Sequence, residues 1–581
     1  MNRRAFLEKN TAVFTAPVAS TLPKVAATGP TPPDGVELSN SLDDGSASAA
    51  RTMAGLGAYT GPWGPVQAAH LLRRALFGPT RTEIVTAAGS SMAQVLDGLF
   101  TPTPAPAPPV RGFVFDFTNV PMGETWVTQG WNPFSEGWRT LSLRTWWMAQ
   151  MVESKTLVEK MTLFWHNHFV VGLDSIGDGR YSYRYLTLLR QNALGNFKQL
   201  TKDITVEPAM LKYLNGNGST AGAPNENYAR ELLELFTIGK GLVTVPGNYT
   251  NYTESDVQAA AKVLTGWQDN GTTLSGYFTA ARHDTSTKQF SSAFGNRTIA
   301  DQGDQEYKAL IDMIFDQAET ARFLCRKLYR WFVYYTIDAT TEQNVIEPMA
   351  QLLIQNNYNV APVLRALLSS EHFYDAVNLG CMIKSPIDYI ASMTRQLEMQ
   401  RFFPPATDPA AYYGQWSAVM NQTGAQDQSL GNPPNVAGWP AYWQAPQYSE
   451  LWINATSLRV RTQHFDILTG FTGYVHLLGG AVHFLKFDPL PLVASLPATV
   501  ASKSDALIAE LALLLLPQPL SPKQLLYLTN ALIPGLPKFE WTKEWNDYVA
   551  NPTNGVIQGG VRAKLLALIR EMTELAEYQL S

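Results

Sequence analysis

Two histidines stand one residue apart in an apolar stretch of the chain, 161-MTLFWHNHFVV-171. They are His166 and His168, and the whole chain of 581 residues has only eight histidines. Imidazole nitrogens bind zinc, iron or manganese, but a histidine in a core can also be held there by hydrogen bonds alone. The pair therefore has two interpretations, a metal site or buried polar side chains that have found partners.

The geometry of the pair depends on where the preceding helix ends. Within a helix, residues two apart point about 200° away from each other, so both rings could not reach one metal ion. In an extended segment they face the same side. Gly172 and Asp174 follow closely and allow the helix to end near His166. Both geometries stay open on the sequence alone.

A second set of polar residues follows helical spacing in 224-PNENYARELLELFTIG-239. Pro224 suits a first helical turn, and Gly239 suits the end of the helix. Apolar residues form one face of this helix. The polar residues on the other face are Asn227, Arg230, Glu231 and Glu234. This face is either solvated, with a Glu226–Arg230 ion pair, or a source of carboxylate ligands.

The functional hypothesis joins these two segments in one polar pocket that holds a divalent metal, which would be zinc, iron or manganese. The expected metal ligands are His166, His168, Glu231 and Glu234. The expected catalytic groups are Glu226 and Glu231, with Arg230 orienting the carboxylates. Metal-bound water with a glutamate base would give a hydrolase, and iron would equally allow an oxidoreductase.

The rival hypothesis is a non-enzymatic binding scaffold in the periplasm or on the cell surface. Its His, Glu and Arg side chains would form a buried network that locks helix packing. His283 and Asp284 could add ligands or an oriented base to the functional hypothesis, or they could simply form a turn. Trp439 lies in an aromatic loop, residues 433–452, that could stack on a glycan or a peptide, or could anchor the loop in the core.

Composition narrows the class of protein. Charged residues are only 16% of the chain, aromatic residues are 11% with 15 Trp, and the formal net charge is −5. Nucleic-acid binding needs a concentrated basic face, and the sequence has no basic run, so we expect no nucleic-acid partner. The two cysteines, Cys325 and Cys381, are too few for a disulfide framework or a cysteine-built zinc site. No apolar run is long enough to cross a bilayer, so we expect no transmembrane segment.

The N-terminus indicates export. Residues 1–28 contain Arg3-Arg4-Ala5-Phe6-Leu7, followed by a mildly apolar stretch and small residues, as in a twin-arginine signal. We therefore expect a periplasmic or extracellular protein. Residues 29–60, rich in Pro, Gly, Ser, Ala and Thr over most of their length, are expected to form a flexible linker.

The rest of the chain has helical periodicity, which predicts a mainly α fold. A main helical domain is expected over 61–468, and an insertion with a C-terminal helical region packed on it over 469–581. A capping box is expected at Thr80 or Thr82, and a small β-hairpin around 275–300. The expected helical runs are 66–78, 140–166, 181–212, 225–238, 254–267, 304–333, 345–371, 384–398, 503–533 and 558–580.

Several motifs taken together resemble the bacterial family catalogued as domain of unknown function 1800. They include AAHLLRRALFGPT (68–80), EKMTLFWHNHF (159–169), APNENYARELLELFTIG (223–239), RHDTSTKQF (282–290) and PPNVAGWP (433–440). The resemblance covers roughly residues 65–465 and the last helix.

The resemblance implies an exported protein, often encoded beside a sulfatase-like protein that could be a partner, and it supplies no settled reaction. The polar landmarks of the family fall on His70, Glu159, His166, His168, Asn225, Glu226, Arg230, Glu231, Glu234, His283 and Asp284. This chain departs from the family pattern in a long, low-charge insertion near 470–550 and in the loop at 283–297.

Overall fold

The computed structural model describes residues 51–116, 120–245, 248–404, 406–439, 452–470, 473–478 and 481–581. These residues belong to one compact unit. The expected export signal and most of the expected linker lie outside the described residues. The end of that linker, residues 51–60, is packed on the helical unit, since the Arg51 backbone N–H donates to Asp338 and Ala58 bridges to Ser370.

The unit is mainly α-helical, which confirms the predicted fold class. The α-helices between residues 65 and 263 are α2 (Pro65–Ala75), α3 (Arg81–Ala88), α4 (Met92–Leu99), α5 (Glu136–Glu153), α6 (Val158–His168), α7 (Leu173–Ile176), α8 (Gly179–Gln191), α9 (Phe197–Thr205), α10 (Pro208–Tyr213), α11 (Glu226–Glu231) and α12 (Glu254–Val263). The π-helical turn η3 (Leu232–Thr237) continues α11.

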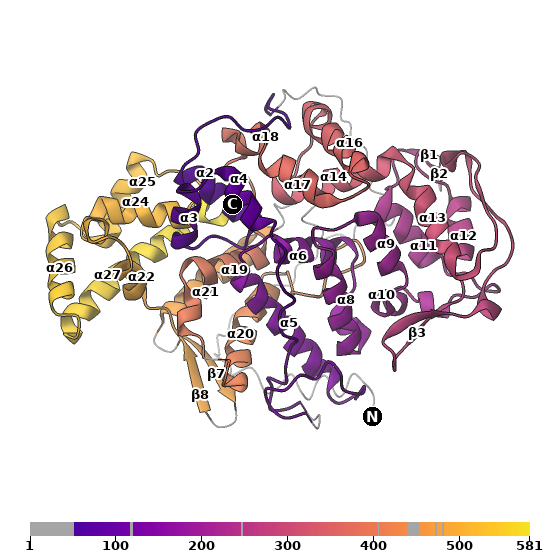
Figure 1. Ribbon diagram of the computed structural model, residues 1–581. Coiled ribbons are helices and arrows are strands. Elements are labelled where there is room, and N and C mark those ends of the chain that lie inside the picture. The colour runs from indigo at the N-terminus through magenta and orange to yellow at the C-terminus, as the bar shows by residue number, and fades with distance from the viewer. Residues whose placement is uncertain are drawn as a thin grey trace, which may run out of the picture. The chain divides into compact units, whose positions relative to one another are not determined.

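The later helices complete the unit. They are α13 (Glu306–Phe315), α14 (Ala318–Phe332), α15 (Ala339–Thr341), α16 (Glu347–Gln355), α17 (Val360–Leu368), α18 (Glu371–Tyr374), α19 (Pro386–Gln396), α20 (Pro409–Gly424), α21 (Ala455–Thr469), α22 (Pro489–Ala494), α23 (Ala498–Ala501), α24 (Ser504–Leu515), α25 (Pro522–Leu532), α26 (Lys538–Ala550) and α27 (Gly555–Glu574). Figure 1 shows α22–α27 at one end of this unit and α9–α13 at the other.

The described strands form four separate two-stranded antiparallel sheets. They are β1 (Val243–Val245) with β2 (Asn248–Tyr249), β3 (Trp267–Asn270) with β4 (Ser275–Phe278), β5 (Lys288–Gln289) with β6 (Thr298–Ile299), and β7 (Tyr474–Leu478) with β8 (Ala481–Leu485). The expected hairpin near 275–300 is therefore present. The β7–β8 hairpin, in the Gly- and Leu-rich stretch, was not predicted.

Most of the long segments predicted as single helices are helical but are divided into two or more helices. Residues 140–166 divide between α5 and α6, with Ser154 extended at the break. The run 345–371 breaks between α16 and α17, where Asn357 and Tyr358 both adopt positive φ. At the second break the residues themselves favour leaving the helix although the apolar spacing continues, since Asn357 tolerates positive φ and Asn359 caps α17.

Two local signals behaved as predicted. Thr80 caps α3 with a full capping box, in which its side chain and that of Glu83 each accept a backbone N–H of the other. Gly239 ends the helix that carries the acidic face, at φ +71°, a conformation that favours glycine. Pro224 lies one residue before Asn225, the N-cap of α11, so the helix begins later than expected.

The core consists of two apolar clusters. The larger one surrounds α6, which is buried from Glu159 to His168, and draws on α5, α8, α9, α14 and α17. The second joins α19 to the C-terminal helices through residues such as Met393, Leu511 and Leu565. A hydrogen bond also joins α19 to the C-terminal helices, since Gln396 Nε2 donates to the Leu514 carbonyl of α24 over 2.6 Å.

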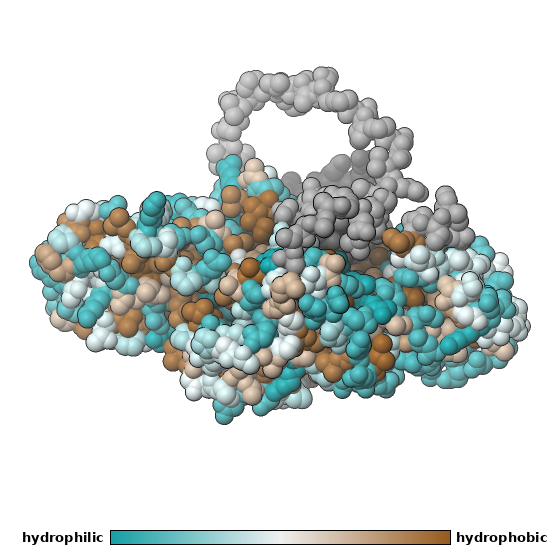
Figure 2. All heavy atoms as spheres, turned by 90° about the horizontal axis from the view of Figure 1, so that it is seen from above, coloured by the Kyte–Doolittle hydropathy of each residue, from teal (hydrophilic) through white to brown (hydrophobic). Residues whose placement is uncertain are grey.

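Hydrophobic residues remain at the surface of the C-terminal helices. Leu526, Phe539, Val549 and Val556 are all more than half exposed. The view in Figure 2 shows hydrophobic residues interspersed among hydrophilic ones at this end of the unit. Among the described helices, none combines the length and the apolar character needed to cross a membrane.

Candidate functional site

The two histidines of the apolar stretch both lie within α6, which continues to His168. The extended geometry considered from the sequence is therefore wrong for this pair, because the apolar core holds the last turn helical. His166 Nδ1 lies 3.2 Å from the Tyr185 hydroxyl, which donates its own hydrogen to the Phe169 carbonyl. Burial lowers the pKa of His166 to about 3, so its ring is neutral at physiological pH.

His168 has no nitrogen left for a metal. Its Nε2 donates to the Phe236 carbonyl over 2.9 Å, and its Nδ1 lies 3.2 Å from Lys327 Nζ. Lys327 also donates to the Leu235 carbonyl over 2.7 Å. The last carbonyls of a helix lack partners within it, so these two side chains satisfy the end of η3. Burial lowers the pKa of Lys327 to about 7.

The acidic face of α11 and η3 forms ion pairs of its own. Arg230 is held by both carboxylate oxygens of Glu254, at 2.6 and 2.8 Å, and lies 3.3 Å from Glu226. Glu234 accepts from the Tyr252 hydroxyl over 3.1 Å and pairs with Lys240 at 2.8 Å.

Glu231, the remaining acid of this face, has a pKa raised to about 7, first by burial and then by the charge of Glu234. Asn225 acts as the N-cap of α11 and donates to the carbonyls of Leu214 and Asn215. Among the described residues, the expected ligands His166, His168, Glu231 and Glu234 are not brought together as a metal-binding group.

The other landmarks are also held by structural contacts. His70 Nε2 lies 3.1 Å from the Phe373 carbonyl, and Glu159 accepts both arms of Arg190 at 2.7 and 2.8 Å. Trp439 is 1% exposed, and its backbone N–H donates to Asn167 Oδ1. It therefore anchors its loop to α6, and the other aromatic residues of that loop at 442, 443 and 448 lie outside the described residues.

Three side chains at the hairpin end of the unit do converge. They are His283, which follows the 3₁₀ turn η4 (Ala280–Arg282), Asp301, which follows β6, and Glu306, the first residue of α13. One donor atom from each lies within 4.8 Å of the others, so the group could hold a metal ion. In the part of the chain that the structure describes, it is the one group of three such residues that meets this spacing.

The orientation of His283 is set by the backbone. Its Nδ1 lies 2.9 Å from the Thr265 carbonyl oxygen, which can only accept, so Nδ1 carries a proton. The Thr265 hydroxyl gives its hydrogen to the Lys262 carbonyl and does not compete. Nε2 faces Glu306 Oε2 at 2.8 Å and Asp301 Oδ1 at 3.7 Å. Facing two acceptors, Nε2 requires either a second proton or a cation between them.

A buried lysine completes the cluster. Lys288 Nζ lies 2.5 Å from Glu306 Oε1 and also donates to the Asp284 carbonyl. The side chains of Lys288 and Glu306 are fully buried, whereas that of Asp301 is 42% exposed. A buried carboxylate needs a countercharge, which Lys288 provides on one side and a cation or imidazolium at His283 would provide on the other. Asp301 is therefore the most exposed member of the cluster.

Sequence reasoning singled out His283 and Asp284 and missed the rest of the cluster. Asp284 Oδ1 accepts from the Ser286 backbone N–H and hydroxyl, so this residue forms a turn. Glu306 resembles an ordinary acid of a first helical turn, and Asp301 an ordinary polar turn residue. Their separation from His283 has no helical or strand period. The usable signal was a histidine and several acids around a short predicted hairpin.

The family model described as "Protein of unknown function (DUF1800)" matches residues 70–572. The matched region includes His283, Lys288, Asp301 and Glu306 as well as α6 and the helix with the acidic face. No curated protein and no solved structure matches this chain.

Proposed function

Because the chain belongs to the DUF1800 family, whose description assigns no activity, we propose its function from the side-chain geometry alone. We propose that it binds a divalent metal ion through His283 Nε2, Asp301 and Glu306, and that the bound metal serves a hydrolytic reaction. The observation that carries this proposal is the ring of His283, whose outward nitrogen faces two carboxylates while its inner nitrogen donates to a backbone carbonyl.

That arrangement is typical of metal-binding histidines. A ligating imidazole usually donates its second N–H to a carbonyl or carboxylate, which fixes the tautomer and the direction of the ring. Thr265 provides such a carbonyl here. On the other side, Lys288 holds Glu306 Oε1 and leaves Oε2 directed at His283.

The ligand types favour a particular range of metals. One imidazole with two carboxylates suits zinc, manganese or iron, and zinc is the first to test. Three protein ligands leave a coordination position for water or substrate, which is typical of hydrolytic sites. The exposed flank of Asp301 offers the route by which a substrate would approach. Oxidoreductase chemistry would require iron or manganese at the same ligands.

We propose export for the same protein. The twin-arginine pattern in residues 1–28 supports translocation of a folded chain to the periplasm or the exterior. A chain that folds in the cytoplasm could acquire its metal there before export. This order would suit a cluster in which the Glu306 ligand is fully buried in the folded chain.

A second candidate function is a binding scaffold without a metal. The observation that favours it is the fully buried Lys288–Glu306 pair at 2.5 Å. With a doubly protonated His283, two positive groups would balance the carboxylates of Asp301 and Glu306. The cluster would then serve only to hold α13 against the hairpins.

Metal analysis separates the two candidates. The protein is purified without chelator, incubated with Zn²⁺, passed over a desalting column and measured by inductively coupled plasma mass spectrometry. We expect one zinc per chain, and a clear loss in His283→Ala and Asp301→Asn. Asp304→Asn is the matched control, because Asp304 is an exposed acid near the same turn and outside the cluster.

Wild-type protein that retains no zinc, or an Asp301→Asn variant that binds it as wild type does, would contradict the metal proposal. The reaction class is tested separately by assaying the zinc-loaded protein on chromogenic carboxylic and phosphoric esters. Hydrolysis that depends on zinc and disappears in Asp301→Asn supports the proposal.

A further inference from the structure

A separate cavity of about 550 Å³ opens between the loop 128–131, the start of α8, α10 and the β3–β4 turn. Its size lies within the range of small-molecule sites, roughly 300 to 1,000 Å³. The residues that matter to its chemistry are Gln129, Trp131, Asp178, Arg180, Lys212 and Asp269. None of these belongs to the His283 cluster.

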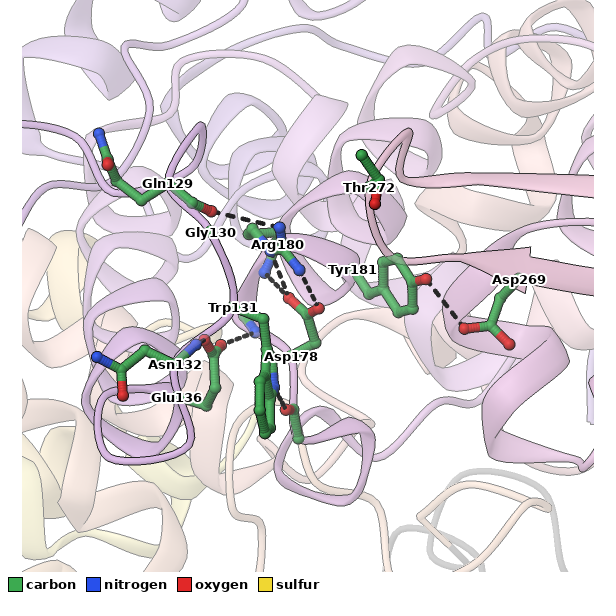
Figure 3. A network of polar contacts seen from close by, with 12 residues as sticks. Gln129, Gly130, Trp131, Asn132, Glu136, Asp178, Arg180, Tyr181, Asp269 and Thr272 are labelled. Carbon is green, nitrogen blue, oxygen red and sulfur yellow. Dashed lines mark hydrogen bonds and ion pairs between the residues drawn. The ribbon is translucent and has the colours of Figure 1, made fainter. Parts of the chain in front are cut away.

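The floor of this cavity consists of charges that are already paired. Asp178 accepts from Arg180 Nε at 3.0 Å and from Arg180 Nη2 at 2.7 Å, and both side chains are almost fully buried. This hydrogen bonding raises the pKa of Arg180. Asp269 accepts from the Tyr181 hydroxyl over 2.9 Å and from the Asn217 side-chain amide over 2.7 Å. Figure 3 shows Asp178, Arg180, Tyr181 and Asp269 side by side.

The walls are held in place from behind. Glu136 Oε2 accepts from the Gly179 N–H over 2.7 Å, and Glu136 Oε1 accepts from the Asn132 N–H over 3.0 Å. The Trp131 indole N–H donates to the Gly177 carbonyl over 2.9 Å. These bonds, visible in Figure 3, connect the loop that carries Trp131 to the start of α8. The cavity is therefore formed before any ligand arrives, which lowers the entropic cost of binding.

The open side presents unused hydrogen-bonding groups beside an aromatic ring. Trp131 is 54% exposed. The side-chain amide of Gln129 and the hydroxyl groups of Thr128 and Thr272 have no partner among the described residues, and all three residues are exposed. An exposed indole that shares one cavity with neutral donors and acceptors is suited to a ligand that has both apolar ring faces and hydroxyl groups.

The charge balance decides the ligand class. Asp178 and Asp269 are negative and Arg180 and Lys212 are positive, so the formal charges that line the cavity sum to zero. An anion would meet two carboxylates, and a cation would meet a guanidinium and an ammonium. A neutral ligand with neighbouring hydroxyl groups can donate to Asp269 and accept from Lys212 at once, while Asp178 and Arg180 stay paired with each other. We propose that this cavity binds a neutral saccharide, with one sugar ring stacked on Trp131.

The test uses the whole protein and four soluble probes, namely cellohexaose, xylohexaose, mannohexaose and chitohexaose. Binding is followed by isothermal titration calorimetry and by tryptophan fluorescence. We expect at least one probe to bind, and Trp131→Ala to weaken that binding by about tenfold or more. Gln129→Ala, a milder change in the same wall, should weaken it by a smaller factor. Phe134→Ala is the control, because Phe134 is 78% exposed nearby but does not line the cavity.

Two results would overturn the proposal. One is the absence of binding for all four probes at millimolar concentration. The other is binding that Trp131→Ala leaves unchanged. Lys212→Met distinguishes the ligand class, because a neutral sugar would lose one hydrogen bond and keep its stacking on Trp131, so its affinity should fall by less than in Trp131→Ala. Binding confined to an acidic ligand such as polygalacturonate or an acidic peptide, and abolished by Lys212→Met, would contradict a neutral saccharide.

Discussion

The histidine pair of α6 and the His283 cluster contain similar residue types and differ in what the ring nitrogens face. His168 directs both nitrogens to partners that hold helix ends together, a carbonyl and the ammonium of Lys327. In His283, Nδ1 donates to the Thr265 carbonyl and Nε2 faces the carboxylates of Asp301 and Glu306. Both regions are buried, so burial alone does not identify a metal site.

What distinguishes a metal site from a core histidine is the partner that each imidazole nitrogen faces. Of the four imidazole nitrogens of His166 and His168, only His166 Nε2 has no partner among the described residues, and no set of carboxylates converges on it there. In the His283 cluster two acceptors face one nitrogen, and this arrangement is stable only with added positive charge. The first region should therefore respond to mutation as a core does, and the second as a ligand site does.

The largest effect is expected for Glu306→Gln. Removing this carboxylate leaves the buried Lys288 with only Asp284, at 3.9 Å, as a nearby countercharge. This should lower the free energy of unfolding by about 3–5 kcal/mol. Urea denaturation measures the change. Added Zn²⁺ should stabilise the wild type and leave the variant unaffected, because only the wild type keeps the ligand set. A loss below about 1 kcal/mol would show that the Lys288–Glu306 pair contributes no more than an exposed ion pair does.

His168→Leu should have the next largest effect and should spare metal binding. Leucine fills a similar volume but cannot bond to the Phe236 carbonyl and Lys327, which lose their shared partner. We therefore expect the free energy of unfolding, measured in urea, to fall by about 2–4 kcal/mol. Bound zinc, measured on the folded variant, should match the wild type. A folded His168→Leu protein that has lost its zinc would move the metal site back to α6.

The pH dependence of Glu231 offers a smaller effect with a defined sign. Its pKa is raised from an ordinary value near 4.5 to about 7, so the folded state binds a proton more tightly than the unfolded state does. The group therefore favours folding at low pH, and this advantage is lost as pH rises from 4.5 to 7. Glu231→Gln should be neutral at pH 4 and stabilising by about 1 kcal/mol at pH 8, after discounting for solvent screening. Equal effects at both pH values would contradict the raised pKa.

Glu254→Gln should produce the smallest change. The Arg230–Glu254 pair is partly exposed, at 33% and 37% of the two side chains, and exposed pairs contribute about 0.2–1 kcal/mol. Thermal denaturation in low and high salt measures it, and the difference from wild type should shrink in high salt. Zinc content should not change. A salt-independent loss of several kcal/mol would mean that this face is a buried network after all.

Much of the fold could be predicted from local patterns. Apolar spacing indicated the mainly α architecture, and Thr80 and Gly239 marked helix boundaries that the structure confirms. The breaks within long runs were missed, because the apolar periodicity continues through them and the Asn-rich segment before α17 was not used as a signal. The β7–β8 hairpin was also missed, since its short segments have no strong alternation around the turn.

The site was harder to predict because it depends on contacts between distant residues. Lys327, whose Nζ contacts His168 Nδ1, lies 159 residues further along the chain. The cluster at His283 needs Glu306 from a helix start and Asp301 from a turn, and neither has a periodic relation to the histidine. Sequence chemistry indicated which residue types to examine, whereas the packing of the hairpins against α13 determined which of them meet.

The most direct test of the central claim is anomalous diffraction from crystals of the protein grown with zinc, recorded on both sides of the zinc absorption edge. We expect one strong anomalous peak at bonding distance from His283 Nε2, flanked by the carboxylates of Asp301 and Glu306. A peak at His166 or His168 instead, or an ordered cluster in which His283 contacts Glu306 directly with no peak between them, would contradict it.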